Sequence, residues 1–95
     1  MTTFRVSAEA NINSLAAAIA GAYADSTERE VCLHCIGPRS VNNGVKAVAT
    51  AKRMMELDGR QNISLVIRPE FMAKMIRGEK ITAVALTVRA EEVEA

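Results

Sequence analysis

The residues best suited to binding chemistry are cations and amides that recur at helical spacing after a Gly-Pro pair. No acidic residue occurs between Glu30 and Glu56. Within this acid-free segment the basic stripe consists of Arg39, Asn43, Lys46, Thr50 and Arg53. Spacings of three and four residues place these side chains on one side of an α-helix, over about 20 Å. Cations neutralise phosphate charge, and Asn and Thr can bond to phosphate or sugar oxygens. The stripe therefore favours nucleic acid as a partner. The alternative is an ordinary solvated helix face, although such faces usually mix both signs of charge.

The start of the same helix offers a second kind of site. Gly37-Pro38 separates a short apolar run from the helical pattern, which indicates a strand–turn–helix junction. Backbone N–H groups and the positive end of the helix dipole would face solvent there, so a small anion or nucleotide bound at residues 37–40 is an alternative. A P-loop is excluded, because six residues separate Gly37 from Gly44 and no hydroxyl residue follows Lys46.

Cys32, His34 and Cys35 are the remaining residues with reactive side chains. Residues three apart on a strand point to opposite faces and lie about 10 Å apart, whereas a disulfide needs less than about 7 Å. We therefore expect two reduced, core-facing thiols rather than a redox motif. His34 is the only histidine and lacks partners for a zinc site or for acid–base catalysis, so a core or interface role is expected. The sequence predicts no catalytic site, no metal, no cofactor and no enzyme activity.

Size and composition indicate a single small domain. The chain has 95 residues, of which 49% are apolar and 3% aromatic. A chain of this length buries only about 60% of its extended surface, so a dimer interface would add stability. The expected domain covers residues 1–90, followed by an acidic tail at 91–95 with Glu91, Glu92 and Glu94. The net charge of +1 hides a basic body behind this tail. The sequence contains neither a membrane span nor a signal peptide, which predicts a cytoplasmic protein, with association with the nucleoid as an option.

Hydrophobic periodicity predicts the order β-α-β-α-β-β, and the small residues of the helices favour a compact α/β sandwich. The first helix is expected to start with Asn13 or Ser14 as its cap and to be followed by a charged turn at residues 25–29. The expected strands cover residues 2–8, 30–36 and 62–68, and Pro69 is expected to interrupt the third of them. The second helix is expected from Arg39 to Leu57. Its packing face is predicted to hold Val41, Val45, Val48, Ala51 and Met55.

The last part of the chain reads as a hairpin with its turn at Gly78-Glu79. Its cations outnumber its acids, and a projecting arm of this kind could reach along a duplex groove. An ordinary solvated hairpin is the alternative. Met72, Met75 and Ile76 would be exposed on a projecting arm, and a second subunit is the natural source of cover.

Three segments of the chain resemble the stage V sporulation protein S family: VSAEANINSLAAAIAG, IGPRSVNNGVKAVATAKRM and RPEFMAKMIRGEKITAVALTV. That family is similar to the Alba-type chromatin and RNA-binding proteins. The resemblance implies a homodimer, nucleic-acid binding and the fold of those proteins, an α/β (α+β) two-layer sandwich with two helices on one face of a mixed four-stranded sheet. It also implies a binding face made of the loop before the first helix, the start of the second helix and the hairpin. The corresponding residues are Asn13, Ser14, Arg39, Ser40, Asn43, Lys46, Lys74, Arg77 and Lys80. Alba proteins carry lysines in the first of these loops, where this chain has Glu9 and no cation, so the cations of the helix and hairpin carry more of the binding.

These observations lead to two hypotheses. The first is a small homodimeric protein that contacts the backbone of DNA or RNA with little sequence specificity and regulates sporulation or development. Arg53 joins the implied binding face through its place in the basic stripe. The second hypothesis is a protein-interaction or scaffolding dimer whose basic face meets an acidic partner, or its own acidic tail acting as a mimic of phosphate.

Overall fold

The computed structural model describes residues 1–24 and 29–93 of the 95-residue chain. Most of the expected charged turn at residues 25–29, and Glu94 of the expected tail, lie outside the described residues. The elements in chain order are β1 (Thr2–Val6), α1 (Ile12–Ala24), β2 (Glu30–Cys35), α2 (Pro38–Leu57), β3 (Ile63–Ile76) and β4 (Glu79–Glu92).

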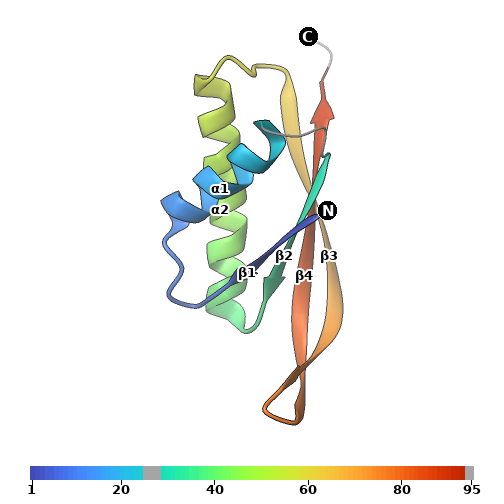
Figure 1. The fold of residues 1–95 in the computed structure, drawn as a ribbon. Helices are drawn as coiled ribbons and strands as arrows, with labels where there is room; N and C mark the ends of the chain where they lie inside the picture. Colours follow the sequence, from blue (N-terminus) through green and yellow to red (C-terminus); the bar gives the residue numbers. More distant parts are fainter. Residues whose placement is uncertain (25–28, 94–95) are drawn as a thin grey trace.

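The strands form one sheet in the order β1-β2-β4-β3, and both helices cover the same face of it (Figure 1). β1 and β2 pair in parallel, whereas β4 is antiparallel to both β2 and β3. The expected two-layer α+β sandwich with a mixed four-stranded sheet is therefore confirmed.

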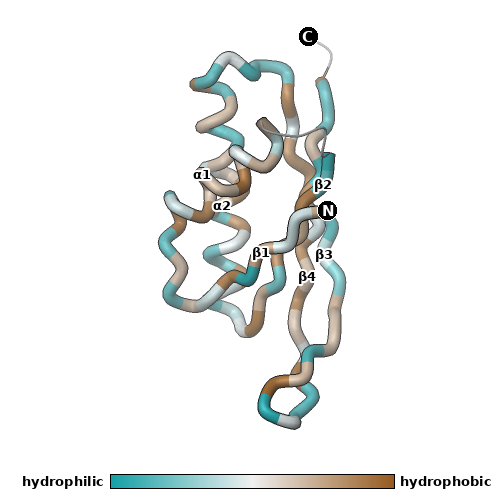
Figure 2. The backbone as a smooth tube through the Cα atoms, in the orientation of Figure 1, coloured by the Kyte–Doolittle hydropathy of each residue, from teal (hydrophilic) through white to brown (hydrophobic). Residues whose placement is uncertain are grey.

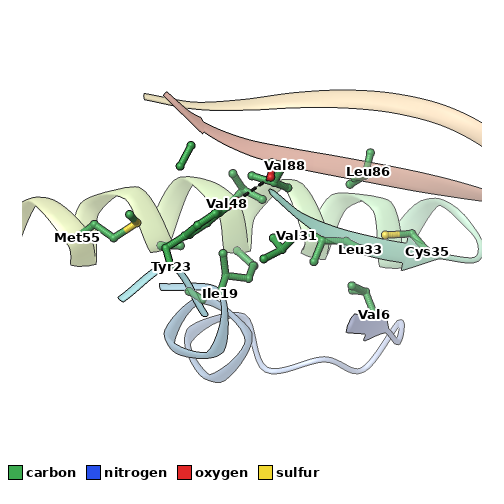
Figure 3. Close-up of a cluster of buried hydrophobic side chains, with 14 residues drawn as sticks. Val6, Ile19, Tyr23, Val31, Leu33, Cys35, Val48, Met55, Leu86 and Val88 are labelled. Atoms are coloured by element: carbon green, nitrogen blue, oxygen red, sulfur yellow. Dashed lines mark hydrogen bonds between the residues drawn. The ribbon is translucent and has the colours of Figure 1, made fainter. Parts of the chain in front are cut away.

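The core lies between the sheet and the two helices (Figure 3). Alternation along β2 directs Val31, Leu33 and Cys35 into this core, because successive strand side chains point to opposite faces. Tyr23 at the end of α1 is buried, and its hydroxyl donates a 2.7 Å hydrogen bond to the Val88 carbonyl of β4. This bond ties α1 to the sheet.

The packing face of α2 differs from the expected one. Val45 is 44% exposed. The buried positions of α2 are Ser40, Gly44, Ala47, Val48, Ala51 and Met55. Gly44 explains the difference, because a Cβ at this position would lie 3.2 Å from Cys35 Sγ and 3.3 Å from Leu86 Cδ1. The helix approaches the sheet through its smallest residues rather than through a row of valines.

The beginning of α1 also corrects a prediction. The helix starts at Ile12, and the side chain of Asn11 accepts a 2.9 Å hydrogen bond from the Ser14 backbone N–H. This is the geometry of an N-cap. Asn13 and Ser14 therefore lie in the first turn and are not the cap.

Pro69 does not interrupt the third strand. β3 runs unbroken from Ile63 to Ile76, with Pro69 opposite Leu86 in the ladder. Within the described part of the chain, β3 is an edge strand that pairs only with β4, and an edge strand tolerates proline where the missing N–H would face solvent.

The hairpin turn lies one residue earlier than expected, at Arg77-Gly78 between Ile76 and Glu79. Both turn residues have positive φ, 50° for Arg77 and 78° for Gly78. Positive φ at both central residues is typical of the two-residue type I′ turn that joins twisted strands.

At the other end of the hairpin, β4 continues through Glu91 and Glu92, which pair with Ser64 and Ile63. The first two residues of the expected acidic tail therefore belong to the sheet.

Candidate nucleic-acid interface

Two cations of the basic stripe are free on the outer surface of α2. Lys46 and Arg53 are exposed, and neither has an ion-pair partner among the residues that the structure describes. Arg39 differs, because its Nη2 lies 3.3 Å from Glu9 Oε1. Both side chains of this pair are largely exposed, at 70% and 80%. Exposed pairs contribute about 0–1 kcal/mol, so a phosphate could displace Glu9 from Arg39.

The Asn43 amide holds the loop between β1 and α1 against α2. Its Nδ2 donates to the carbonyls of Ser7 and Ala8, at 3.3 Å and 3.1 Å. Together with the Arg39–Glu9 pair, this contact fixes the loop next to the first turns of α2. Asn43 thus positions the loop.

The hydroxyls of Ser40 and Thr50 are both bonded to backbone carbonyls of the same segment. Ser40 is fully buried, and its Oγ lies 2.6 Å from the Ile36 carbonyl and 2.9 Å from the Gly37 carbonyl. Thr50 Oγ1 donates to the Lys46 carbonyl one turn earlier, at 2.9 Å. The expectation that Ser40 contacts nucleic acid is corrected by its burial: its hydroxyl stabilises the start of α2.

The first turn of α1 presents Asn13 and Ser14 to solvent. The loop that precedes them and the start of α2 lie toward the end of the molecule from which the hairpin extends (Figure 1). The structure therefore places the three implied segments at one end, with the loop and α2 in direct contact through Asn43.

The hairpin projects as a two-stranded ribbon. Pairing between β2 and β4 ends at Cys35 and Val84, whereas β3 and β4 pair down to Ile76 and Glu79. Its cations do not share one surface. Lys74 is opposite Ile81 and Lys80 is opposite Met75 in the ladder, so the two lysines lie on opposite faces of the ribbon. Arg77 occupies the tip.

Apolar side chains are exposed on the same ribbon, whose far end combines hydrophobic and hydrophilic segments (Figure 2). Phe71 is 84% exposed. It lines a cavity of about 270 Å³ together with Pro69, Glu70 and Val84. The expected exposure of Met75 and Ile76 is also observed, whereas Met72 is half-buried.

His34 lies on the face of the sheet away from the helices (the open face), next to residues that sequence reasoning missed. It is half-buried and pairs across the β1–β2 ladder with Arg5. Burial lowers the pKa of His34, and the charges of Lys74 and Arg5 lower it further. His34 is therefore neutral at pH 7. Only the strand register brings Arg5 next to His34, and no sequence spacing signals it.

The two cysteines point to opposite faces of β2, as their spacing predicts, but only Cys35 faces the core. Both are buried free thiols; Cys35 belongs to the core under the helices, and Cys32 lies on the other face of β2. Burial raises the pKa of the Cys35 thiol, and neighbouring Cys32 adds to the effect. In residues 1–24 and 29–93 no group of three or more metal-binding side chains comes together. Within the same ranges, neither helix combines the length and apolar character needed to cross a bilayer.

The fold is the Alba fold. The chain superposes on Alba from Thermoplasma volcanium with a TM-score of 0.64, covering 96% of this chain and 100% of that chain. Sequence identity is 8%, so this likeness shows the fold alone. The sequence matches the family "Stage V sporulation protein S (SpoVS)" over residues 2–91, and the chain belongs to this family. The resemblance stated from the sequence is thus confirmed for family and fold.

Proposed function

We propose that this protein is a homodimeric nucleic-acid-binding protein that contacts the phosphate backbone with little sequence specificity. Its family membership adds a regulatory role in sporulation or development to the proposal. The observation that carries it is the pair of cations Lys46 and Arg53, which are exposed on α2 and have no ion-pair partner among the described residues. Arg39 extends this surface toward the loop once phosphate replaces Glu9.

The hairpin supplies a second contact region. Arg77 at its tip and Lys80 on one ribbon face are exposed, so they can reach phosphates beyond those met by α2. Aromatic side chains contribute little to this mode, because Tyr23 is buried in the core and Phe71 is the one exposed aromatic side chain among the described residues. Backbone contact by cations predicts binding to several kinds of nucleic acid, with DNA and RNA both included.

A second copy of the chain is proposed to cover the apolar part of the hairpin. Phe71 is almost fully exposed beside an apolar cavity, on a strand at the edge of the sheet. A large apolar side chain in such a place favours protein contact over solvent. Two protomers joined there would place two α2 surfaces in one particle and lengthen the region available to a polyanion.

Binding of labelled duplex DNA, single-stranded DNA and RNA of equal length tests the proposal. The double variant Lys46→Gln/Arg53→Gln should lose affinity for all three. Arg29→Gln/Arg89→Gln is the matched control. It removes the same charge from the end of the sheet away from the hairpin, where both arginines lie beside Glu91 and Glu92. Equal losses of affinity in both variants would mean that binding depends on net charge and not on the position of the cations. No change in either variant would favour an acidic protein partner for the basic stripe.

A further inference from the structure

A cavity of about 360 Å³ lies on the open face, where the hairpin passes the ends of β1 and β2. Its walls divide into two chemical halves. The polar half is formed by Arg5, Ser7, His34 and Lys74, and the apolar half by Val6, Ile36, Met75 and Ile76. These residues come from three separate parts of the chain.

The polar half is assembled by the sheet and by the ribbon. Arg5 and His34 are Cα partners in the β1–β2 ladder. Lys74 comes from the part of β3 that lies beyond the last β2–β4 pair, Cys35 with Val84. Two-stranded ribbons twist more strongly than wide sheets, and this brings Lys74 to the side of β2.

The charges around His34 are almost all positive. Burial lowers the pKa of His34, and the charges of Lys74 and Arg5 lower it further. None of the residues that line the cavity is acidic. Ala85 of β4 pairs with His34 on one side and with Glu70 on the other, so Glu70 lies on the same face, two strands away from His34. The Glu70 Oε1 is 3.5 Å from Arg68 Nε.

On β4, the neighbour of His34 is Ala85, which carries no charge. No helix contributes to the cavity, because both helices pack on the other face of the sheet (Figure 1). The cavity is therefore a concave site with concentrated positive potential and no carboxylate in its wall.

We propose that this cavity binds the phosphate group of a nucleotide, with the sugar and base against its apolar half. Arg5 and Lys74 supply charge-assisted hydrogen bonds to the phosphate oxygens, and the neutral His34 ring donates one N–H. This inference goes beyond the proposed function, because a single nucleotide would occupy the cavity without any contact to the basic stripe. The nucleotide can be a free mononucleotide or one unit of a strand.

Phosphate in the cavity favours the imidazolium form of His34, because an anion stabilises the adjacent positive charge. Binding therefore raises the pKa of His34, and affinity rises as pH falls through that pKa. His34 is the only histidine of the chain, so its imidazole proton signals are assigned without ambiguity in an NMR spectrum.

The test is an NMR titration of His34 with adenosine 5′-monophosphate, with a dinucleotide that has one internal phosphodiester, and with adenosine. The phosphodiester keeps its charge across the pH range in which His34 titrates. Both phosphate ligands should move the His34 signals saturably and raise its pKa, whereas adenosine should not. A response to adenosine 5′-monophosphate alone assigns the site to terminal phosphates. No response to either phosphate ligand, or an equal response to adenosine, would overturn the inference.

Variants separate this site from the proposed polyanion surface. Arg5→Gln should weaken mononucleotide binding by about tenfold, as expected for a lost charged hydrogen bond. Arg68→Gln is the matched control, because Arg68 lies on the same face outside the cavity. Equal weakening by both substitutions would contradict a site in this cavity. Lys46→Gln/Arg53→Gln should bind the mononucleotide normally, so failure of the polyanion surface and failure of the cavity give different results.

Discussion

At the residue scale, Arg77 combines an unfavourable backbone with an exposed charge. Among the described residues it is the only one other than glycine with positive φ. The left-handed region costs most side chains about 1–2 kcal/mol, and asparagine is one of the few that tolerate it. An arginine at the tip of a projecting arm is therefore better explained by what it contacts than by stability.

Arg77→Asn should separate these two properties. Asn-Gly is the preferred sequence of a type I′ turn, so the free energy of unfolding should rise by about 0.5–1 kcal/mol in denaturant titrations. Affinity for duplex DNA should fall, because the charge at the tip is lost. Arg77→Lys serves as the control, because it keeps both the positive charge and the unfavourable backbone conformation at the tip. If Arg77→Asn binds as tightly as the wild type, the hairpin tip is not part of the interface.

His34 predicts a pH dependence of stability. Its pKa in the folded protein is lowered, chiefly by burial and then by Lys74 and Arg5, so folding favours the neutral ring. The unfolded chain then binds more protons than the folded one as pH falls from 7 toward 5. The stabilising contribution is present above the unfolded-state pKa and is lost as pH falls through the folded-state pKa.

Chemical denaturation of the wild type and of His34→Gln across this range isolates the effect of His34. The difference in unfolding free energy between the two proteins should change with pH, with the wild type losing more at low pH. A constant difference between pH 5 and pH 7 would contradict the account of His34, whatever the carboxylates contribute to both proteins.

At the element scale, Tyr23 joins α1 to the rest of the fold at two points. Its hydroxyl donates to the Val88 carbonyl of β4, and its own carbonyl accepts from Arg60 Nη2 at 3.3 Å, just after α2. Tyr23→Phe should destabilise the protein by about 1 kcal/mol, the usual contribution of one hydrogen bond. Thermal denaturation measures this loss. Unchanged stability would show that the bond from the Tyr23 hydroxyl to Val88 does not help to hold α1.

The elements themselves were largely predictable from sequence. The range of α2 and the order of strands follow from apolar periodicity and from Gly37-Pro38, because those signals are local. Continuity of β3 through Pro69 was not predictable, since it depends on β3 being an edge strand. The buried face of α2 was misplaced because Gly44 and Ser40 gain their role only from close contact with the sheet.

The candidate site was predictable only in part. Lys46 and Arg53 could be identified because helical spacing places them together without tertiary information. The group of Arg5, His34 and Lys74 could not, because it depends on parallel register and on the twist of the ribbon. The partner of Arg39, Glu9, likewise lies far away along the chain and becomes a neighbour only through the loop that Asn43 holds.

At the scale of the whole molecule, the protomer is elongated, with principal extents of 47 × 21 × 20 Å, and the hairpin forms one end (Figure 1). Phe71→Asp should shift a dimer to monomer in sedimentation experiments, because it places a charge in the apolar contact. Leu57→Asp is the matched control: Leu57 is 81% exposed at the end of α2 and outside the hairpin. A dimer that survives Phe71→Asp would place the interface elsewhere.

Lys46 and Arg53 are proposed to contact phosphates, and the salt dependence of duplex binding measures this directly. Wild-type affinity should fall linearly on a plot of log K against log salt, by about 0.9 for each phosphate neutralised. Lys46→Gln/Arg53→Gln should make the slope shallower by about 1.8 per protomer, whereas Arg29→Gln/Arg89→Gln should keep the wild-type slope. A flat plot for the wild type, or a slope that Lys46→Gln/Arg53→Gln leaves unchanged, would contradict the account.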